Sequence, residues 1–159
     1  MIRTGIGFDV HKYEQVEGAF IILGGIKIPS KYRVIAHSDG DVLLHALADA
    51  ILGAIAADDI GVHFPPTDMK WKGVDSSKIV KHAAKLMKEK GGSINNIDMI
   101  ILAERPKIMP HKEMIRKNIA EMLEINIDQV NLKATTTEKL GFVGREEGLA
   151  AQVICTITV

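Results

Sequence analysis

The chain has 159 residues, enough for one domain with a substantial hydrophobic core and too few for two. Hydrophobic residues make up 47% of it and charged residues 25%, a globular composition that excludes a disordered protein. Twenty basic and twenty acidic residues cancel, which argues against nucleic-acid and membrane-surface binding, because both need a positive field.

The first third of the chain predicts strands followed by a helix. Residues 2–10 are typical of a strand interrupted by glycines, and residues 19–28 of two short strands joined by a two-residue glycine turn. Ser38 or Asp39 can cap a helix that runs to about Ala57 and has one apolar face.

The middle of the chain alternates in the same way. Residues 60–75 concentrate glycine and proline, which predicts an exposed loop, and residues 76–90 predict a second helix that a glycine pair ends. Residues 97–103 form a strand apolar enough to be buried on both faces. Pro110 fits the start of a third helix that reaches about Leu123.

Two final strands, at residues 130–137 and 151–159, flank a glycine loop at residues 139–148. Strands interleaved with helices predict a two-layer α/β sandwich in which a mixed β-sheet has its helices packed on one side. Without repeats or linkers, residues 1–159 form a single domain. The only cysteine, Cys155, excludes a disulfide framework and favours a reducing compartment, and we find no signal peptide, transit peptide or membrane-spanning run.

A metal-ligand pattern lies near the N-terminus. Asp9 and His11 are two residues apart, so in a strand they project from one face, and His45 lies on the predicted helix. Two histidines and a carboxylate suit a zinc site with an open fourth position, and Asp41 or Asp49, four residues from His45, can orient its ring. The spacing alone is more typical of a strand-end Asp-x-His beside an unrelated histidine.

Two further segments can bind phosphate. His37 and Ser38 precede a helix N-terminus and offer an imidazole, a hydroxyl and free N–H groups, although taken alone they indicate only a helix cap. The threonine run at residues 133–138 ends at Glu138, whose carboxylate suits a hard divalent cation, or else it is an ordinary strand with a capping residue. Lys107, after another strand, can pair with phosphate or simply be solvated.

Six segments, in order and spacing, resemble the 2-C-methyl-D-erythritol 2,4-cyclodiphosphate synthase family across nearly the whole chain. They are Gly5–His11, Leu23–Gly25, Ala36–Asp41, Leu44–Leu47, Asp59–Pro65 and Lys133–Gly144. The resemblance implies a homotrimer with active sites between subunits, zinc on Asp9, His11 and His45, and Mg²⁺ or Mn²⁺ on Glu138. It also implies a cytoplasmic bacterial protein, or a plastid stromal one if the chain is a mature processed form.

The same resemblance assigns residues to the substrate. A cytidine diphosphate pocket contains Ala103, Pro106, Lys107, Ile108, Met109, Ala134, Thr135, Thr136 and Thr137. The region around the methylerythritol phosphate contains Asp9, His11, His37, Ser38, Asp59, Gly61, Phe64 and Asp68. Catalytic roles fall to His37, Asp49, Thr136 and Glu138. A cavity on the threefold axis, lined by Phe8, Phe142 and Arg145, can hold an isoprenoid diphosphate.

The implied activity is that of a metal-dependent phosphorus–oxygen lyase of the non-mevalonate isoprenoid pathway. It closes a cytidine-diphosphate-activated methylerythritol phosphate to a cyclic diphosphate and releases CMP. Two departures from the family's pattern are Pro66, where an Asp is usual, and Gln152, where a Glu is common. The alternatives are a zinc hydrolase of nucleotide diphosphates, with water as nucleophile, and a trimeric binding module for isoprenoid diphosphates without enzymatic activity.

Overall fold

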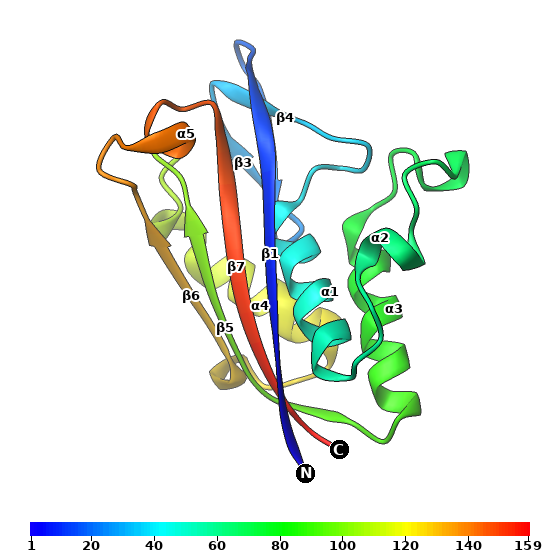
Figure 1. Ribbon diagram of the computed structural model, residues 1–159. Coiled ribbons are helices and arrows are strands. Elements are labelled where there is room, and N and C mark those ends of the chain that lie inside the picture. Colours follow the sequence, from blue (N-terminus) through cyan, green and yellow to red (C-terminus); the bar gives the residue numbers. More distant parts are fainter.

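The computed structural model describes residues 1–159 as a two-layer α/β sandwich. Figure 1 shows the long helices on one side of a five-stranded sheet with the strand order β4-β1-β7-β5-β6. Only β5 and β6 run parallel, so the sheet is mixed, as the sequence predicted. The sheet strands are β1 (Ile2–Gln15), β4 (Tyr32–Ile35), β5 (Ser93–Leu102), β6 (Val130–Thr135) and β7 (Gly148–Thr158).

The remaining elements cover or flank this sheet. A separate hairpin contains β2 (Phe20–Leu23) and β3 (Ile26–Pro29), on either side of the predicted glycine turn. The long helices are α1 (Val42–Ala54), α3 (Ser76–Glu89) and α4 (Lys112–Leu123). The short ones are α2 (Ile60–His63), α5 (Gly141–Gly144) and the 3₁₀ turns η1 (Met69–Trp71), η2 (Met109–His111) and η3 (Ile127–Gln129).

Two glycines of β1 allow the α1 backbone to lie directly on the strand. A Cβ atom added to Gly5 would lie 1.9 Å from the carbonyl oxygen of Ala50, and one added to Gly7 would lie 1.8 Å from that of Ala46. Because no side chain fits there, the glycines that interrupt the predicted strand are packing positions. This close contact places His45 of α1 beside Asp9 and His11, the next residues of β1 whose side chains point toward the helices.

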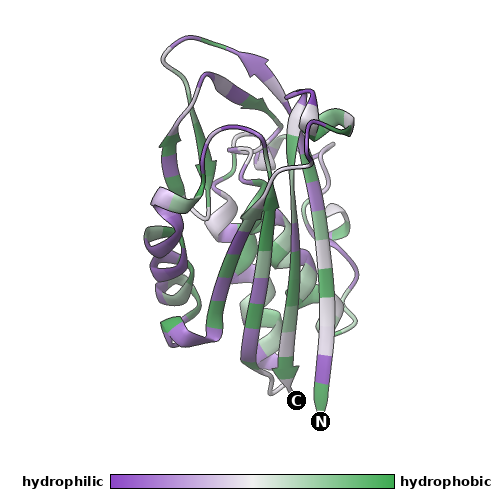
Figure 2. Ribbon diagram, turned by 90° about the vertical axis from the view of Figure 1, so that its left-hand side faces the viewer, coloured by the Kyte–Doolittle hydropathy of each residue, from purple (hydrophilic) through white to green (hydrophobic).

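The sheet has one buried face and one open face. On β5, Ile97, Met99 and Ile101 are fully buried beneath the helices, whereas Ile100 on the opposite face is only half-buried. The prediction that this strand is buried on both faces is therefore wrong for the single chain. Part of the open face is nevertheless apolar, and Figure 2 shows hydrophobic and hydrophilic residues recurring along the strands. Its most exposed large apolar side chains are Ile2, Ile6, Phe8, Val10 and Ile154.

Several boundaries differ from the prediction: α1 ends at Ala54 instead of about Ala57, β6 ends at Thr135 instead of residue 137, and β5 and β7 begin at Ser93 and Gly148 instead of residues 97 and 151. The first helix is capped by Asp41 instead of Ser38 or Asp39, because Asp41 is the residue whose side chain accepts the Leu44 N–H. The first strand continues to Gln15, where it pairs with β4, a strand of four residues that is too short to show alternation in the sequence. The predicted loop at residues 60–75 is largely exposed, but it contains α2 and η1.

Asp41 also ties the hairpin to the helix layer. Its fully buried carboxylate accepts N–H groups from Gly24, Gly25 and Leu44 at 2.7–3.0 Å. Burial raises the pKa of Asp41 to about 6, although these three donors oppose the rise. At pH 7.5 the carboxylate is thus ionised and fully bonded.

We expect Asp41→Ala to lower the free energy of unfolding by roughly 3–5 kcal/mol, because it removes a helix cap and leaves buried N–H groups without acceptors. Urea unfolding at pH 7.5 measures the loss. Asp75→Ala is the matched control, since the exposed Asp75 caps α3 with a bond to the backbone N–H of Ser77, and its loss should cost about 1 kcal/mol. Equal losses in the two variants would show that Asp41 is an ordinary cap.

Candidate metal centre

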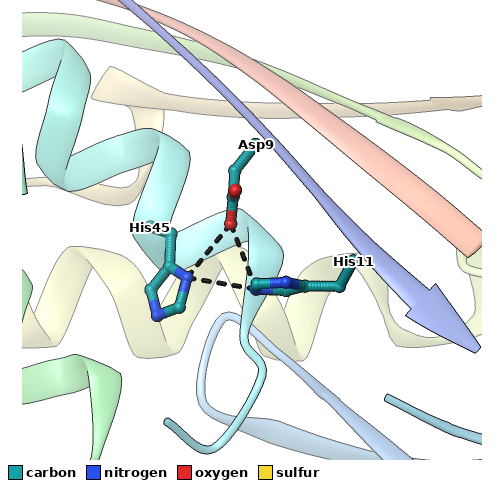
Figure 3. A group of neighbouring side chains, drawn as sticks. All are labelled: Asp9, His11 and His45. Atoms are coloured by element: carbon teal, nitrogen blue, oxygen red, sulfur yellow. Dashed lines mark hydrogen bonds and ion pairs between the residues drawn. The ribbon is translucent and has the colours of Figure 1, made fainter. Parts of the chain in front are cut away.

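Three predicted ligands from two elements meet in one cluster. Asp9 and His11 project from the helix-facing side of β1, and His45 lies near the start of α1 (Figure 3). Asp9 Oδ2, His11 Nε2 and His45 Nδ1 lie 3.0–3.1 Å from one another. His45 is buried, with 7% of its surface exposed, while the other two are half-buried. The three predicted ligands therefore meet, although spacing alone favoured a strand-end Asp-x-His beside an unrelated histidine.

This donor set fits a divalent metal ion. Two imidazole nitrogens and one carboxylate oxygen are zinc ligands, and tetrahedral zinc with bonds of about 2.0–2.1 Å separates its ligands by roughly 3.3 Å. The observed spacing is within a few tenths of an ångström of that value. Burial opposes the charge of Asp9, yet hydrogen bonds from His11 and His45 hold the pKa of its carboxyl well below the usual range. A carboxylate that stays ionised while partly buried is a suitable cation ligand.

The other ring nitrogen of His45 does not reach either predicted aspartate. Its Nε2 lies 2.8 Å from Ser76 Oγ and 3.1 Å from Ser38 Oγ. Asp41 is occupied as the helix cap, and Asp49 accepts the backbone N–H of Ile60 at 2.8 Å. The expectation that one of these aspartates orients His45 is therefore wrong. Asp41 and Asp49 lie on the same face of the helix as His45, as a spacing of four requires, but each is about one turn away from its ring.

A pocket of about 260 Å³ opens beside the cluster. It brings together eight residues predicted for the metal or the substrate: Asp9, His11, His37, Ser38, His45, Gly61, Phe64 and Asp68. Part of its wall is apolar and was not predicted; this part includes Met69, Trp71, Val74 and Ile79. The only sequence signal for that wall was a tryptophan within a loop of glycine and proline.

Asp49 and Asp59 hold the loop that closes this pocket but do not line it. Asp49 binds the first N–H of α2, and Asp59 caps the same helix by accepting the Val62 N–H at 3.1 Å. Burial raises the pKa of Asp49 even though the Ile60 N–H opposes the rise. The two carboxylates thereby fix where the loop leaves α1.

The predicted nucleotide residues lie at another edge of the sheet. Figure 1 shows the ends of β5 and β6 on the opposite side of the sheet from the α2 loop. β1 and β6 are separated by β7 and β5, hence by three strand spacings, or roughly 14 Å. Glu138 and Lys107 are exposed, and Glu138 belongs to no group of three ligand-type side chains. The structure does not bring these residues into the pocket of the same chain.

Local contacts shape this second region. The Glu104 carboxylate accepts the N–H groups of Thr137 and Lys139 at 3.1–3.2 Å, and the Thr136 hydroxyl accepts that of Glu138 at 3.3 Å. The Tyr13 hydroxyl donates to the Arg105 carbonyl at 2.8 Å. Glu104 and Tyr13 were not predicted, because neither the sequence spacing nor a motif links them to this loop.

The predicted nucleotide and cavity residues differ in exposure. Ala103 and Ile108 are buried; Pro106, Ala134 and Thr137 are half-buried; and Met109, Thr135, Thr136, Phe8, Phe142 and Arg145 are exposed. Arg145 forms an ion pair with Glu147 at 2.8 Å.

None of the helices has the length and apolarity needed to cross a bilayer.

Comparison with known proteins places these features in a family. Residues 2–158 match the sequence model of the YgbB family. The chain is 53% identical over 156 residues to 2-C-methyl-D-erythritol 2,4-cyclodiphosphate synthase of Azotobacter vinelandii, a match covering 98% of each chain. Its fold is similar to the bifunctional IspDF from Campylobacter jejuni, with a TM-score of 0.93, 44% identity and coverage of 99% of this chain and 42% of that one.

A second solved structure is similar over nearly its full length. It is IspF from Plasmodium falciparum in a CDP complex, with a TM-score of 0.87 and 35% identity, and the match covers 98% of this chain and 95% of that one. The chain spans less than half the length of the bifunctional protein but nearly all of the Azotobacter and Plasmodium proteins.

Proposed function

Because this chain belongs to the YgbB family, we propose that it is a 2-C-methyl-D-erythritol 2,4-cyclodiphosphate synthase of the non-mevalonate isoprenoid pathway. The reaction converts 4-diphosphocytidyl-2-C-methyl-D-erythritol 2-phosphate to the cyclic diphosphate and releases CMP. The observation that carries the proposal is that the Asp9, His11 and His45 donor set lines a pocket that also contains the Ser38 hydroxyl and the His37 imidazole.

The bond changes need no protein nucleophile. An oxygen of the 2-phosphate attacks the β-phosphorus, the bond from that phosphorus to the oxygen bridging to the α-phosphorus breaks, and CMP leaves with the bridging oxygen. Neither water nor an oxidant enters the balance. The protein must therefore fold a flexible substrate back on itself, and holding the reacting groups together provides much of the rate.

The residues of the chain divide this work. Asp9, His11 and His45 would hold zinc, and Glu138 would hold Mg²⁺ or Mn²⁺. When bound, the two cations polarise the β-phosphate and neutralise the charge of the departing CMP. His37 and Ser38 contact the 2-phosphate at the pocket, while Lys107 and the hydroxyls of Thr135 and Thr136 hold the diphosphate.

The open sheet face supports assembly into a homotrimer. Ile6, Phe8 and Val10 of β1 form an apolar strip with Ile154 of β7, and a monomer would leave it in water. Burying this face between three chains also places the nucleotide edge of one subunit beside the metal edge of the next. The threefold cavity, lined by Phe8, Phe142 and Arg145, can then hold an isoprenoid diphosphate.

Incubation with the cytidine substrate, zinc and manganese or magnesium, followed by phosphorus NMR, tests the activity. The proposal predicts a cyclic diphosphate and one CMP per turnover, with no ¹⁸O uptake from labelled water. An open-chain phosphate carrying ¹⁸O would identify a zinc hydrolase. No turnover in a zinc-loaded trimer would favour a binding module.

We expect Glu138→Gln to retain zinc and the fold but to lower turnover by about 100-fold or more, because the second cation loses its carboxylate. Titration with manganese should show saturation in the native enzyme and a weak, near-linear response in the variant. Glu104→Gln is a control for loop shape, since its amide keeps one oxygen for the N–H groups of Thr137 and Lys139. Unchanged rate and manganese dependence in Glu138→Gln would exclude the second-metal role.

A further inference from the structure

A buried hydrogen-bond chain runs away from the metal centre behind His45. Ser76, the first residue of α3, is fully buried and its Oγ lies 2.8 Å from His45 Nε2. The Ser76 hydroxyl donates to Asp39 Oδ1 at 2.5 Å, and its backbone N–H donates to Asp39 Oδ2 at 3.0 Å. Apart from two tyrosines and Cys155, the only buried side chains with polar groups are those of Asp41, His45 and Ser76, and two of these three belong to this hydrogen-bond chain.

The hydrogen atoms of the chain can be assigned by elimination. A carboxylate only accepts hydrogen bonds, so the proton between Ser76 and Asp39 belongs to the serine hydroxyl. With its single proton used, Ser76 Oγ must accept from His45 Nε2, which therefore carries a proton. Nδ1 lies 3.0 Å from an Asp9 oxygen, a contact that a proton on Nδ1 makes when no cation is there; a cation bound between them would replace that proton and meet the Nδ1 lone pair, while Nε2 keeps its own proton. Nδ1 is the nitrogen that faces Asp9 and His11.

We propose that Asp39 and Ser76 are positioning residues for His45, fixing both its ring orientation and the tautomer that binds the metal. The inference deepens the proposed function and rests on its zinc site. The Asp39 charge, transmitted through the Ser76 hydroxyl, also makes His45 Nδ1 a stronger electron donor to a cation, as carboxylate–histidine pairs do in metal sites. Here a serine is inserted between the carboxylate and the histidine.

The same elimination assigns a donor to the pocket. Ser38 Oγ accepts the Gly40 N–H at 3.2 Å and lies 3.1 Å from the protonated Nε2 of His45. The one proton of Nε2 is directed to Ser76, so Nε2 has no lone pair for the Ser38 hydroxyl, and the Gly40 N–H occupies a lone pair of Ser38 Oγ. The Ser38 proton is therefore directed to neither. Because Ser38 lines the pocket, this proton is available to a phosphate oxygen of the substrate.

Two backbone hydrogen bonds beside this network hold the C-terminal end of the loop at residues 60–75, which lines the pocket. The Gly73 N–H donates to the His37 carbonyl at 2.7 Å, and the Asp39 N–H donates to the Val74 carbonyl at 3.2 Å. The loop at residues 60–75 therefore ends next to Ser76, the residue that contacts His45. Asp39 and Ser76 lie 37 residues apart in the sequence, and only the packing of α3 beside α1 brings them together.

The test measures zinc affinity in the full-length protein by competition with a chromophoric chelator, without substrate. Ser76→Ala should weaken zinc binding about 10- to 100-fold, the usual effect of removing an outer partner of a metal-bound histidine. Asp39→Asn should weaken it less. Adding Asp39→Asn to Ser76→Ala should change little, because Asp39 acts through the serine. Ser77→Ala, one residue along the same helix, should leave zinc affinity unchanged.

Thermal unfolding of the zinc-free variants separates positioning from a structural role. If Asp39 and Ser76 merely anchor α3, the variants lose stability while their zinc affinity equals that of the native protein, and the inference is overturned. Additive effects of the two substitutions on zinc affinity would also overturn it. A native protein that binds zinc but forms no cyclic product would refute the proposed function and leave this inference standing.

Discussion

Replacing His45 by alanine is expected to remove zinc from the protein and to slow cyclodiphosphate formation at least about a thousandfold. His45 is the most buried of the three donors and the only one from α1. Without it, Asp9 and His11 are left as two adjacent ligands of one strand, too few for a tetrahedral site. A bound cation stabilises the charge that develops in the transition state by several kcal/mol, and each 1.4 kcal/mol corresponds to a tenfold change in rate.

Zinc content per chain, measured by atomic emission, and turnover by phosphorus NMR give the two readouts. His82→Ala is the control for zinc content, because His82 is a half-buried histidine of α3 that contacts His63 and Phe64 but no donor atom of the cluster. Circular dichroism in the presence of a chelator checks that both variants keep the fold. Full zinc occupancy in His45→Ala would refute the donor set.

Short-range rules indicated part of the donor set. Alternation along a strand places Asp9 and His11 on one face, and the glycines before them permit a helix to lie against that face. His45 then needed only to lie near the start of the predicted helix. The resemblance to a family supplied the pairing of strand and helix, which spacing alone left open.

The hydrogen-bond partners of the donors could not be predicted in the same way. Ser76 comes 31 residues after His45, and its role depends on how α3 packs beside α1. The spacing rule favoured Asp41 and Asp49, which the structure uses for a helix cap and a loop anchor. Buried polar groups take the nearest unsatisfied partner in space, and sequence distance carries little information about that.

The open face of the sheet illustrates a different limit. The apolar sequence of β5 predicted burial on both faces, yet Ile100 is only half-buried in the single chain. A strand with helices on both faces and a strand whose second face is covered by another subunit have the same apolar pattern. In both cases the two faces are shielded from water. The sequence was therefore informative about burial but silent about what covers the second face.

The separation of the two halves of the site leads to the final prediction, that each active site contains residues from two subunits. His45→Ala inactivates the zinc half of every site, and the double variant Lys107→Ala, Glu138→Ala inactivates every nucleotide half. Each protein alone should be inactive. Unfolded together in equal amounts and refolded, they form mixed trimers in which about one interface in four joins two intact halves, because the cyclic arrangement repeats one type of interface.

Activity near a quarter of that of native enzyme refolded in parallel is the expected result, and varying the mixing ratio should change it as the product of the two subunit fractions. Native mass spectrometry verifies that mixed trimers form. If they form without any recovery of activity, each site is built within one chain, and the roughly 14 Å across three strand spacings must then be bridged by the substrate alone. Recovery far above a quarter would indicate that one half tolerates its substitutions.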